Sequence, residues 1–263
     1  MLLSDNVLSL DPAERPAAFD ARRELAKLAG AQRRMLPQSA PDVSGYAIAL
    51  AYRPACAATG DYHDFFPLQG RRTAMFVGDG SGHGPAASVL GATLRAIFRT
   101  YPGLHEEAGN TLTTVGRLLH DLIPADLFMT GLYLTLEEDG QVTWASAGHE
   151  PPLRVSRAGR VTAADLTAIG MPLGINPDET YTTVRWQLAP GERLLLCTDG
   201  LWEVHNRVGQ AFGRRGLQRE LAACAGLPLD DMVRGVVARA AEHRGREDFE
   251  DDFTVVGVER WAE

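Results

Sequence analysis

The stretch MFVGDGSGHGP, residues 75–85, starts with an apolar run typical of a buried strand and ends with a pattern typical of a helix start. Asp79, four glycines, one serine and one histidine lie within it. A loop of this kind can bind phosphate through backbone N–H groups, present a nucleophilic serine, or hold a metal ion through its carboxylate. The rest of the chain has to distinguish these functions.

Nucleotide binding and serine nucleophile catalysis fit this loop poorly. A P-loop requires GxxxxGK[ST], and the single lysine of the chain is Lys27. Residues 82–87 match GxGxxA, but Asp79 would bring negative charge close to a pyrophosphate, and the regular β-α-β alternation of dinucleotide-binding folds is absent. The residues around Ser81 read DGSGH, which lacks the GxSxG spacing of a nucleophile elbow.

Carboxylates at the ends of apolar runs favour the metal hypothesis. Asp61 precedes such a run, Asp79 and Asp199 each follow one, and Asp251 or Asp252 precedes the last. Singly, each Asp-Gly pair would indicate a plain turn. Together they are carboxylates that lose hydration on burial, which is costly unless positive charge compensates. Oxygen ligands are typical of Mg²⁺ or Mn²⁺ rather than zinc, so we expect a divalent metal site. A role of His83 as a direct ligand is the weaker alternative to simple packing.

Composition excludes several other classes of function. Twenty-six basic residues against thirty-four acidic ones leave a net charge of −8, which argues against a nucleic-acid-binding surface. Three cysteines stand far apart without a CxxC pair, which argues against disulfides or a cysteine zinc site. The start carries no basic region typical of a signal peptide, and no apolar run reaches about eighteen residues. We therefore expect a cytoplasmic protein without a membrane span.

The order of the expected elements indicates an α+β fold. Apolar alternation predicts many strands joined by short turns, among them a hairpin that turns at Asp139-Gly140. Helical periodicity is found in pairs between groups of strands, and once before them. The expected helices span residues 12–36, 85–100, 108–122, 212–224 and 229–243. This order favours helices packed on antiparallel sheets. We expect a helical extension over residues 1–41 and a single domain over residues 42–263.

Six segments follow one another along the chain: GDYHDFFPL, VGDGSGHGPAA, SAGHEPPL, GMPLGI, LLLCTDGLWE and DDFTVV. In this order they resemble bacterial PPM-type (protein phosphatase 2C-like) serine/threonine phosphatases of the SpoIIE/RsbU group, and the resemblance covers about residues 45–260. It implies a β-sandwich of two antiparallel sheets flanked by helices, in α-β-β-α layers. It also implies hydrolysis of phosphoserine or phosphothreonine on a protein by a metal-activated water, with two Mn²⁺ or Mg²⁺ ions. The usual substrates in this group are STAS-domain anti-sigma-factor antagonists.

The same resemblance assigns roles to individual residues. Asp79 would bridge both ions, and the Gly80 carbonyl would contact one of them. Asp61 would hold the second ion, and Asp199 the first. Asp79 and Asp199 would thus be catalytic through the water that the ions activate.

The last metal ligand could be either of two adjacent residues. The resemblance favours Asp251 on the first ion, with Asp252 as the alternative. SAGHEPPL and GMPLGI would shape loops near the site, with His149 as a candidate substrate contact. His63 and Trp202 depart from the common pattern of the group, and these departures would alter substrate recognition.

The segment ELAKLAGAQRRMLPQSAP, residues 24–41, resembles the helical connector that often joins these domains to a sensor or dimerises them. We therefore expect the N-terminal helix to pair with a second copy or to receive a separate regulator. The alternative to catalysis is a PPM-fold module that binds a phosphorylated partner without hydrolysing it. Loss of metal carboxylates would mark such a module, and all are present here.

Overall fold

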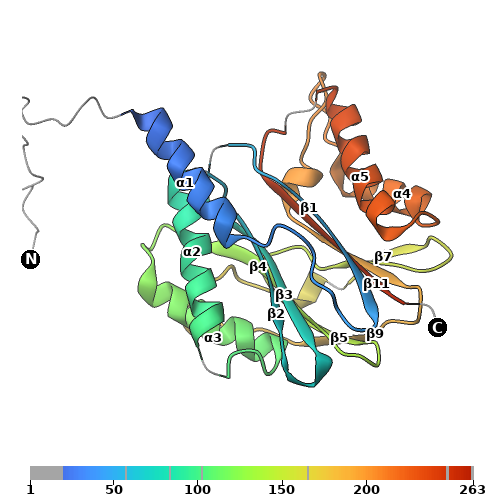
Figure 1. The fold of residues 1–263 in the computed structure, drawn as a ribbon, viewed down its shortest axis with the longest axis horizontal. Coiled ribbons are helices and arrows are strands. Elements are labelled where there is room, and N and C mark those ends of the chain that lie inside the picture. Colours follow the sequence, from blue (N-terminus) through green and yellow to red (C-terminus); the bar gives the residue numbers. More distant parts are fainter. Residues whose placement is uncertain are drawn as a thin grey trace, which may run out of the picture.

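Two β-sheets lie face to face at the centre of the molecule (Figure 1). The structure is a computed structural model, and it describes residues 20–56, 58–82, 84–101, 103–164, 166–246 and 249–261. The first sheet is antiparallel, with the strand order β1 (Tyr46–Arg53), β11 (Phe253–Arg260), β10 (Arg193–Cys197), β6 (Leu153–Val155) and β7 (Val161–Ala163).

The second sheet carries the MFVGDG stretch on β3. Its order is β2 (Asp61–Pro67), β3 (Thr73–Gly80), β4 (Met129–Leu136), β5 (Gln141–Ala147) and β8 (Ile169–Gly170), and β9 (Val184–Gln187) also pairs with β5. Its pairs are antiparallel except for the short parallel pair β5–β8. The predicted hairpin is confirmed between β4 and β5, where Gly140 takes a φ of +92° that glycine adopts readily.

Within the described part of the chain, five α-helices lie outside the two sheets, and four of them cover the outer sheet faces (Figure 1). Helices α2 (Pro85–Thr100) and α3 (Ala108–Leu122) pack on the second sheet, and α4 (Gly213–Cys224) and α5 (Leu229–Arg244) on the first. The last four helices were predicted to within one residue at each end. Helix α1 (Ala21–Met35) packs against α2. It was predicted to start near residue 12, but residues 1–19 lie outside the described ranges.

Alternation along β3 shows why this strand is apolar on both faces. Met75 and Val77 belong to the core between the two sheets, whereas Ala74 and Phe76 belong to the core beneath α2 and α3. Successive side chains of a strand point to opposite faces, so a strand between a helical layer and a second sheet has to be apolar throughout. A third core lies between the first sheet and α4 and α5. The predicted α-β-β-α layering is therefore confirmed.

None of the helices in the described ranges has both the length and the apolar character needed to cross a bilayer.

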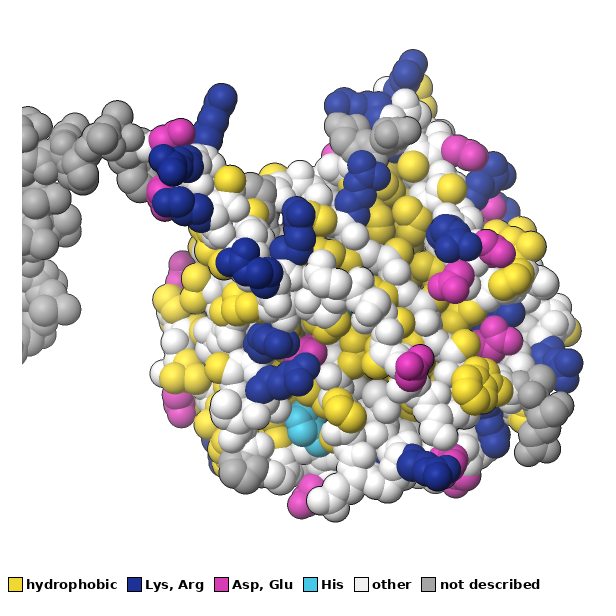
Figure 2. Space-filling view, in the orientation of Figure 1, with side chains coloured by type: hydrophobic (Ala, Val, Ile, Leu, Met, Phe, Trp, Pro, Cys, Tyr) yellow, Lys and Arg dark blue, Asp and Glu magenta, His cyan; other side chains and the backbone are white. Residues whose placement is uncertain are grey.

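The boundary expected at residue 41 lies between α1 and β1, and it stays a prediction. Figure 2 shows Lys and Arg side chains along α1, whose exposed basic residues are Arg22, Arg23, Lys27, Arg33 and Arg34.

Candidate metal centre

Asp61 and Asp79 lie directly opposite each other on neighbouring antiparallel strands. Asp61 begins β2, and Asp79 is the penultimate residue of β3. Side chains at opposed positions share a face of the sheet, with Cβ atoms about 4.5–5.5 Å apart, and like charges there repel each other. This pair of carboxylates therefore requires protons or a cation.

Contacts from the other sheet hold Asp61 in place. Its Oδ2 accepts hydrogen bonds from the hydroxyls of Thr198, at 2.9 Å, and Thr254, at 2.6 Å. Thr198 follows β10 and Thr254 lies in β11, so both hydroxyls come from the facing sheet. The side chain is buried, and burial together with the charge of Asp79 raises its pKa well above the usual range, although the two hydroxyls lower it. Asp61 thus links the two sheets at the same edge as Asp79.

Three carboxylates from two segments of the chain place negative charge close to Asp79. Burial, followed by the charges of Asp199, Asp251 and Asp252 in that order, raises its pKa to about 8, although a backbone hydrogen bond from Gly80 lowers it. Asp199 directly follows the Thr198 turn after β10, and the other two precede β11. Since β10 and β11 are antiparallel neighbours, with Cys197 opposite Val255, the end of one strand lies beside the start of the other. The fold therefore brings together the carboxylates that the sequence singled out.

Glycines allow the oxygen atoms of this edge to approach one another. A Cβ on Gly60 would lie 3.0 Å from the Gly80 carbonyl oxygen, 3.1 Å from Asp79 Oδ1 and 3.2 Å from the Gly82 carbonyl oxygen. A Cβ on Gly200 would lie 1.9 Å from the Asp252 carbonyl oxygen, which no side chain tolerates. Carboxylate and carbonyl oxygens of this kind are the donors that Mg²⁺ and Mn²⁺ prefer, so the donor set fits these ions.

The arrangement is one of opposed carboxylates rather than a closed ligand set. Within the described ranges, no three or more His, Cys, Asp and Glu side chains are already gathered at the spacing of metal ligands. Asp61 and Asp79 are opposed on neighbouring strands, Asp199 follows β10, and their role as ligands stays a prediction. His83 lies outside the described residues.

A cavity of about 170 Å³ opens beside Asp79 and Asp199, and we call it the acidic cavity. The raised pKa of Glu203, which burial and the charges of Asp199 and Asp251 cause, shows that the surroundings of this carboxyl are negatively charged. Arg214 supplies positive charge to the wall. The complete lining is Asp79, Thr130, Gly148, His149, Glu150, Thr198, Asp199, Trp202, Glu203 and Arg214. The cavity can therefore attract cations on one side and an anionic group on the other.

Comparison with protein families agrees with this geometry. The family model described as Stage II sporulation protein E (SpoIIE) matches residues 69–261, which is more than half of the chain. The chain belongs to the SpoIIE family. The matched residues include Asp79, Asp199 and both candidates for the last ligand, and they leave Asp61 outside.

Two relatives show how widely the likeness to SpoIIE-family proteins extends. The phosphoserine phosphatase RsbU of Bacillus subtilis is 26% identical over 244 residues, which cover 92% of this chain and 71% of that protein. Protein IcfG of Synechocystis sp. is also 26% identical, over 91% of this chain. The match covers 42% of IcfG, so this chain spans less than half of that relative.

Solved structures share the fold. The RsbU and RsbW domains of Rv1364c from Mycobacterium tuberculosis match with a TM-score of 0.76 and 28% identity, over 87% of this chain and 64% of that one. The SiaA-PP2C domain of Pseudomonas aeruginosa matches with a TM-score of 0.77 and 22% identity, over 92% and 97%. RsbX, solved in complex with magnesium, matches with a TM-score of 0.61 and 16% identity, over 83% and 97%. The PPM-type fold class is therefore shown.

The two adjacent candidates for the last ligand have different surroundings in this SpoIIE-family chain. Asp252 is buried, and its two carboxylate oxygens accept hydrogen bonds from the backbone N–H groups of Ala55, at 2.7 Å, and Gly60, at 2.8 Å. Asp251 is exposed, and its Oδ1 accepts from the N–H of Asp252 at 2.8 Å. This difference favours Asp251 as the ligand and Asp252 as the residue that positions the loop before Asp61.

Asp64, in the same DYHD segment as Asp61, has a structural role. It is fully buried and forms ion pairs with Arg95, at 2.6 Å, and Arg99, at 2.5 Å, both on α2. The Tyr62 hydroxyl donates to it at 2.9 Å. The two arginines are more than thirty residues away in sequence, so local sequence pattern could not reveal them. Arginine neutralises Asp64, whereas carboxylates surround Asp79.

Ser81 and His63 also have structural contacts. Ser81 Oγ accepts a hydrogen bond from the Phe128 N–H at 3.0 Å, which agrees with the rejection of a serine nucleophile. His63 is fully buried, and its Nε2 lies 3.1 Å from the Pro37 carbonyl oxygen. Burial lowers its pKa to about 4. His63 is therefore not accessible at the surface, and its position does not support the expectation that it alters recognition. Trp202, in contrast, lines the acidic cavity.

Sequence reasoning missed the contact between Gln32 on α1 and the loop before Asp61. Gln32 is buried; its Nε2 donates to the Thr59 carbonyl at 2.7 Å, and its Oε1 accepts from the Thr59 N–H at 3.0 Å. Thr59 Oγ1 in turn accepts from the Asp61 N–H at 3.0 Å. A glutamine in an amphipathic helix gives no signal by itself, because its partner lies 27 residues downstream.

Proposed function

We propose that this SpoIIE-family chain is a metal-dependent protein serine/threonine phosphatase. The observation that carries the proposal is the position of Asp79. It lies opposite Asp61, and the negative charges of Asp199 and Asp251 raise its pKa. A site that concentrates carboxylates is typical of divalent-cation binding, and such sites serve phosphoryl transfer. The family match and the resemblance to the phosphoserine phosphatase RsbU support this reaction.

The chain offers two ligand groups for Mn²⁺ or Mg²⁺, and we propose two ions. Asp61, Asp79 and the Gly80 carbonyl would hold one, and Asp79, Asp199 and Asp251 the other. When bound, such ions lower the pKa of a water molecule and polarise phosphoryl oxygens, so no protein nucleophile is required. The similar fold of RsbX, solved with magnesium, supports the choice of metal.

The residues of the chain supply position and charge for this reaction. Thr198 and Thr254 fix Asp61 through their hydroxyls. Asp252 holds the loop at Gly60 in place through the Gly60 N–H. Arg214, in the wall of the acidic cavity, forms an ion pair with Glu150, and a phosphate group that enters the cavity would compete with this carboxylate for the guanidinium.

The substrate that we propose is a phosphorylated STAS-domain protein of a sigma-factor regulatory pathway. The likeness to RsbU and to the RsbU and RsbW domains of Rv1364c supports an Rsb-type pathway. We expect release of inorganic phosphate from phosphoserine STAS proteins of the same genome when Mn²⁺ is present, and none with a chelator. Phosphate release and intact-protein mass spectrometry measure it. Stable binding of the phosphoprotein without phosphate loss would instead identify a non-catalytic binding module.

We further propose that α1 either pairs with a second copy or receives a separate regulator, and that Gln32 passes this state to the metal site. Replacement of Gln32 by alanine leaves the buried Thr59 N–H and carbonyl without their partner, next to Asp61. Loss of a contact behind a metal ligand typically costs about 10–100-fold in metal affinity or activity, and we expect an effect in this range.

Aryl phosphate turnover, titrated with Mn²⁺, measures the effect of Gln32→Ala. Gln38→Ala is the matched control, because Gln38 Nε2 donates to the carbonyls of Arg33 and Leu36 within the connector itself. Molar mass by light scattering tests the pairing of α1. Equal Mn²⁺ dependence in both variants would contradict the coupling.

A further inference from the structure

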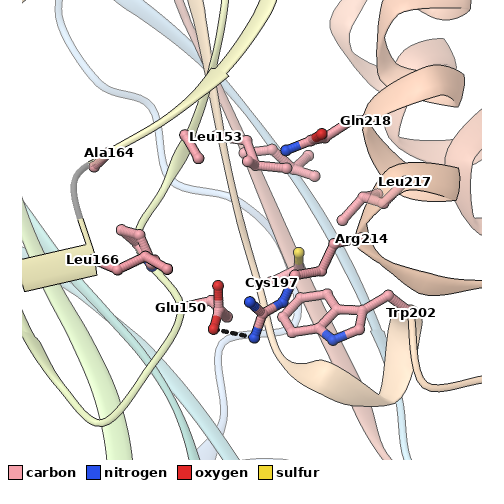
Figure 3. Close-up of a pocket in the computed structure, with 12 residues that line it drawn as sticks. Glu150, Leu153, Ala164, Leu166, Cys197, Trp202, Arg214, Leu217 and Gln218 are labelled. Atoms are coloured by element: carbon pink, nitrogen blue, oxygen red, sulfur yellow. Dashed lines mark hydrogen bonds and ion pairs between the residues drawn. The ribbon is translucent and has the colours of Figure 1, made fainter. Parts of the chain in front are cut away.

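A second cavity, of about 350 Å³, adjoins the acidic cavity, and we call it the apolar cavity (Figure 3). Residues of β6, β10 and α4 line it, together with the last residue of β7 and the segment that follows β7. Apolar side chains make up most of this wall: Pro151, Leu153, Ala163, Ala164, Leu166, Leu195 and Leu217. A concave and mainly apolar surface with a few polar groups is typical of a ligand site.

Three residues form a wall common to both cavities: Glu150, Trp202 and Arg214. Arg214 forms an ion pair with Glu150, drawn as a dashed line in Figure 3, and its guanidinium lies 5.9 Å from the centre of the Trp202 ring. A group bound next to Asp79 and Asp199 therefore lies one side chain away from the apolar cavity. This continuity indicates that one ligand can occupy both.

Exposure of the apolar wall is greatest where η3 (Leu166–Ala168) follows β7. Leu166 is 53% exposed, and Ala163 is also exposed, although both line the cavity. Neither side chain belongs to the core between the first sheet and helices α4 and α5. Their apolar surface is thus available to a binding partner, and covering it is favourable.

We propose that the apolar cavity receives a large aliphatic or aromatic side chain that lies within a few residues of the phosphoserine in the protein substrate. This inference rests on the proposed phosphatase function. The phosphate enters the acidic cavity, the substrate backbone passes over Glu150 and Arg214, and the neighbouring apolar side chain enters the apolar cavity. Recognition then requires both a phosphate and an apolar residue at a fixed spacing.

Phosphoserine peptides test this spacing directly. Each peptide carries one leucine, at a position from three residues before to three residues after the phosphoserine, in a background of glycine, serine and alanine. We expect leucine at one position to raise kcat/KM about tenfold over alanine, the usual discrimination by an apolar pocket. Leu166→Asp and Ala163→Asp should remove this preference and leave aryl phosphate turnover unchanged. Leu122→Asp, the same change at a leucine 62% exposed on α3, should keep it.

Each outcome has a defined meaning. Hydrolysis of all peptides without a leucine preference, or a preference that survives both cavity variants, overturns this inference and leaves the proposed function standing. Absence of any peptide and aryl phosphate hydrolysis by the wild type overturns both. A change of molar mass in Leu166→Asp, without a leucine preference in the wild type, would assign the cavity to a second copy of the chain and overturn the proposal.

Discussion

Asp79→Asn is expected to abolish Mn²⁺-dependent hydrolysis of an aryl phosphate. The substitution keeps the shape of the side chain and removes the charge that both proposed ligand groups share. A two-metal site contributes several kcal/mol of charge stabilisation to the transition state, and about 4 kcal/mol corresponds to a factor of about a thousand in rate. We therefore expect a loss of at least about a thousandfold in kcat/KM, and loss of Mn²⁺ binding in calorimetry.

When a chelator removes the metal, Asp79→Asn should be at least as stable as the wild type. The folded state raises the pKa of Asp79 to about 8, so it binds the proton more tightly than the unfolded chain does. The stability that this proton contributes is present below the unfolded pKa, about 4, and is lost as pH rises through about 8. Asparagine carries no charge at any pH. Its advantage in thermal unfolding over the wild type should be small at pH 5, grow as pH rises to about 8, and stay constant above that.

Asp139→Asn is the matched control for this experiment. Asp139 is exposed in the β4–β5 turn, where its Oδ1 accepts a hydrogen bond from the Gln141 N–H at 2.9 Å, as an amide oxygen also can. This variant should keep wild-type turnover. Retained activity in Asp79→Asn, at a Mn²⁺ concentration that saturates the wild type, would refute the proposed metal centre.

Asp251→Asn and Asp252→Asn are expected to fail in different ways. Asp251 is exposed and raises the pKa of Asp79, so its replacement should cost on the order of a thousandfold in metal-dependent turnover, with little change in thermal stability. Asp252 accepts from two backbone N–H groups in a buried position. An amide there turns its NH₂ group toward one of these donors, which leaves a buried N–H without a partner.

The loss of that hydrogen bond should destabilise Asp252→Asn by about 2 kcal/mol, because a buried unsatisfied group costs about 1–3 kcal/mol. For a domain of this size, this corresponds to a fall of about 4–8 °C in Tm. Thermal unfolding and Mn²⁺-dependent aryl phosphate turnover, measured on both variants, separate the two roles. A stable, inactive Asp252→Asn beside an active Asp251→Asn would reverse the assignment of the ligand.

Local sequence pattern was sufficient for four helices and the longer strands of the fold, and it missed the short strands β6, β7 and β8. The helices over residues 85–100 and 108–122 have the predicted ends, since apolar spacing and Pro85 at the first turn are local signals. The strand ending at Asp79 was recognisable because both of its faces are buried and its apolar run is continuous. Resemblance to a known family supplied the layer order, which the structure then confirmed.

Contacts between distant segments could not be derived in this way. Asp64 and Asp61 lie in one segment and look alike in sequence, yet arginines of α2 neutralise the first, and threonines of the facing sheet hold the second. Gln32 gave no signal of its contact with Thr59. In each case the partner approaches through packing of whole elements, which periodicity within one element does not encode.

The sequence by itself determined which carboxylates border buried strands and which glycines follow them, because burial and turn formation depend on neighbours along the chain. The tertiary structure alone decided which of these carboxylates share one electrostatic environment. Pairing of β2 with β3 sets Asp61 opposite Asp79, and pairing of β10 with β11 brings Asp199 and Asp251 close enough to shift the pKa of Asp79. Charge interactions act through space, so their strength is set by the register of the strands and the packing of the two sheets.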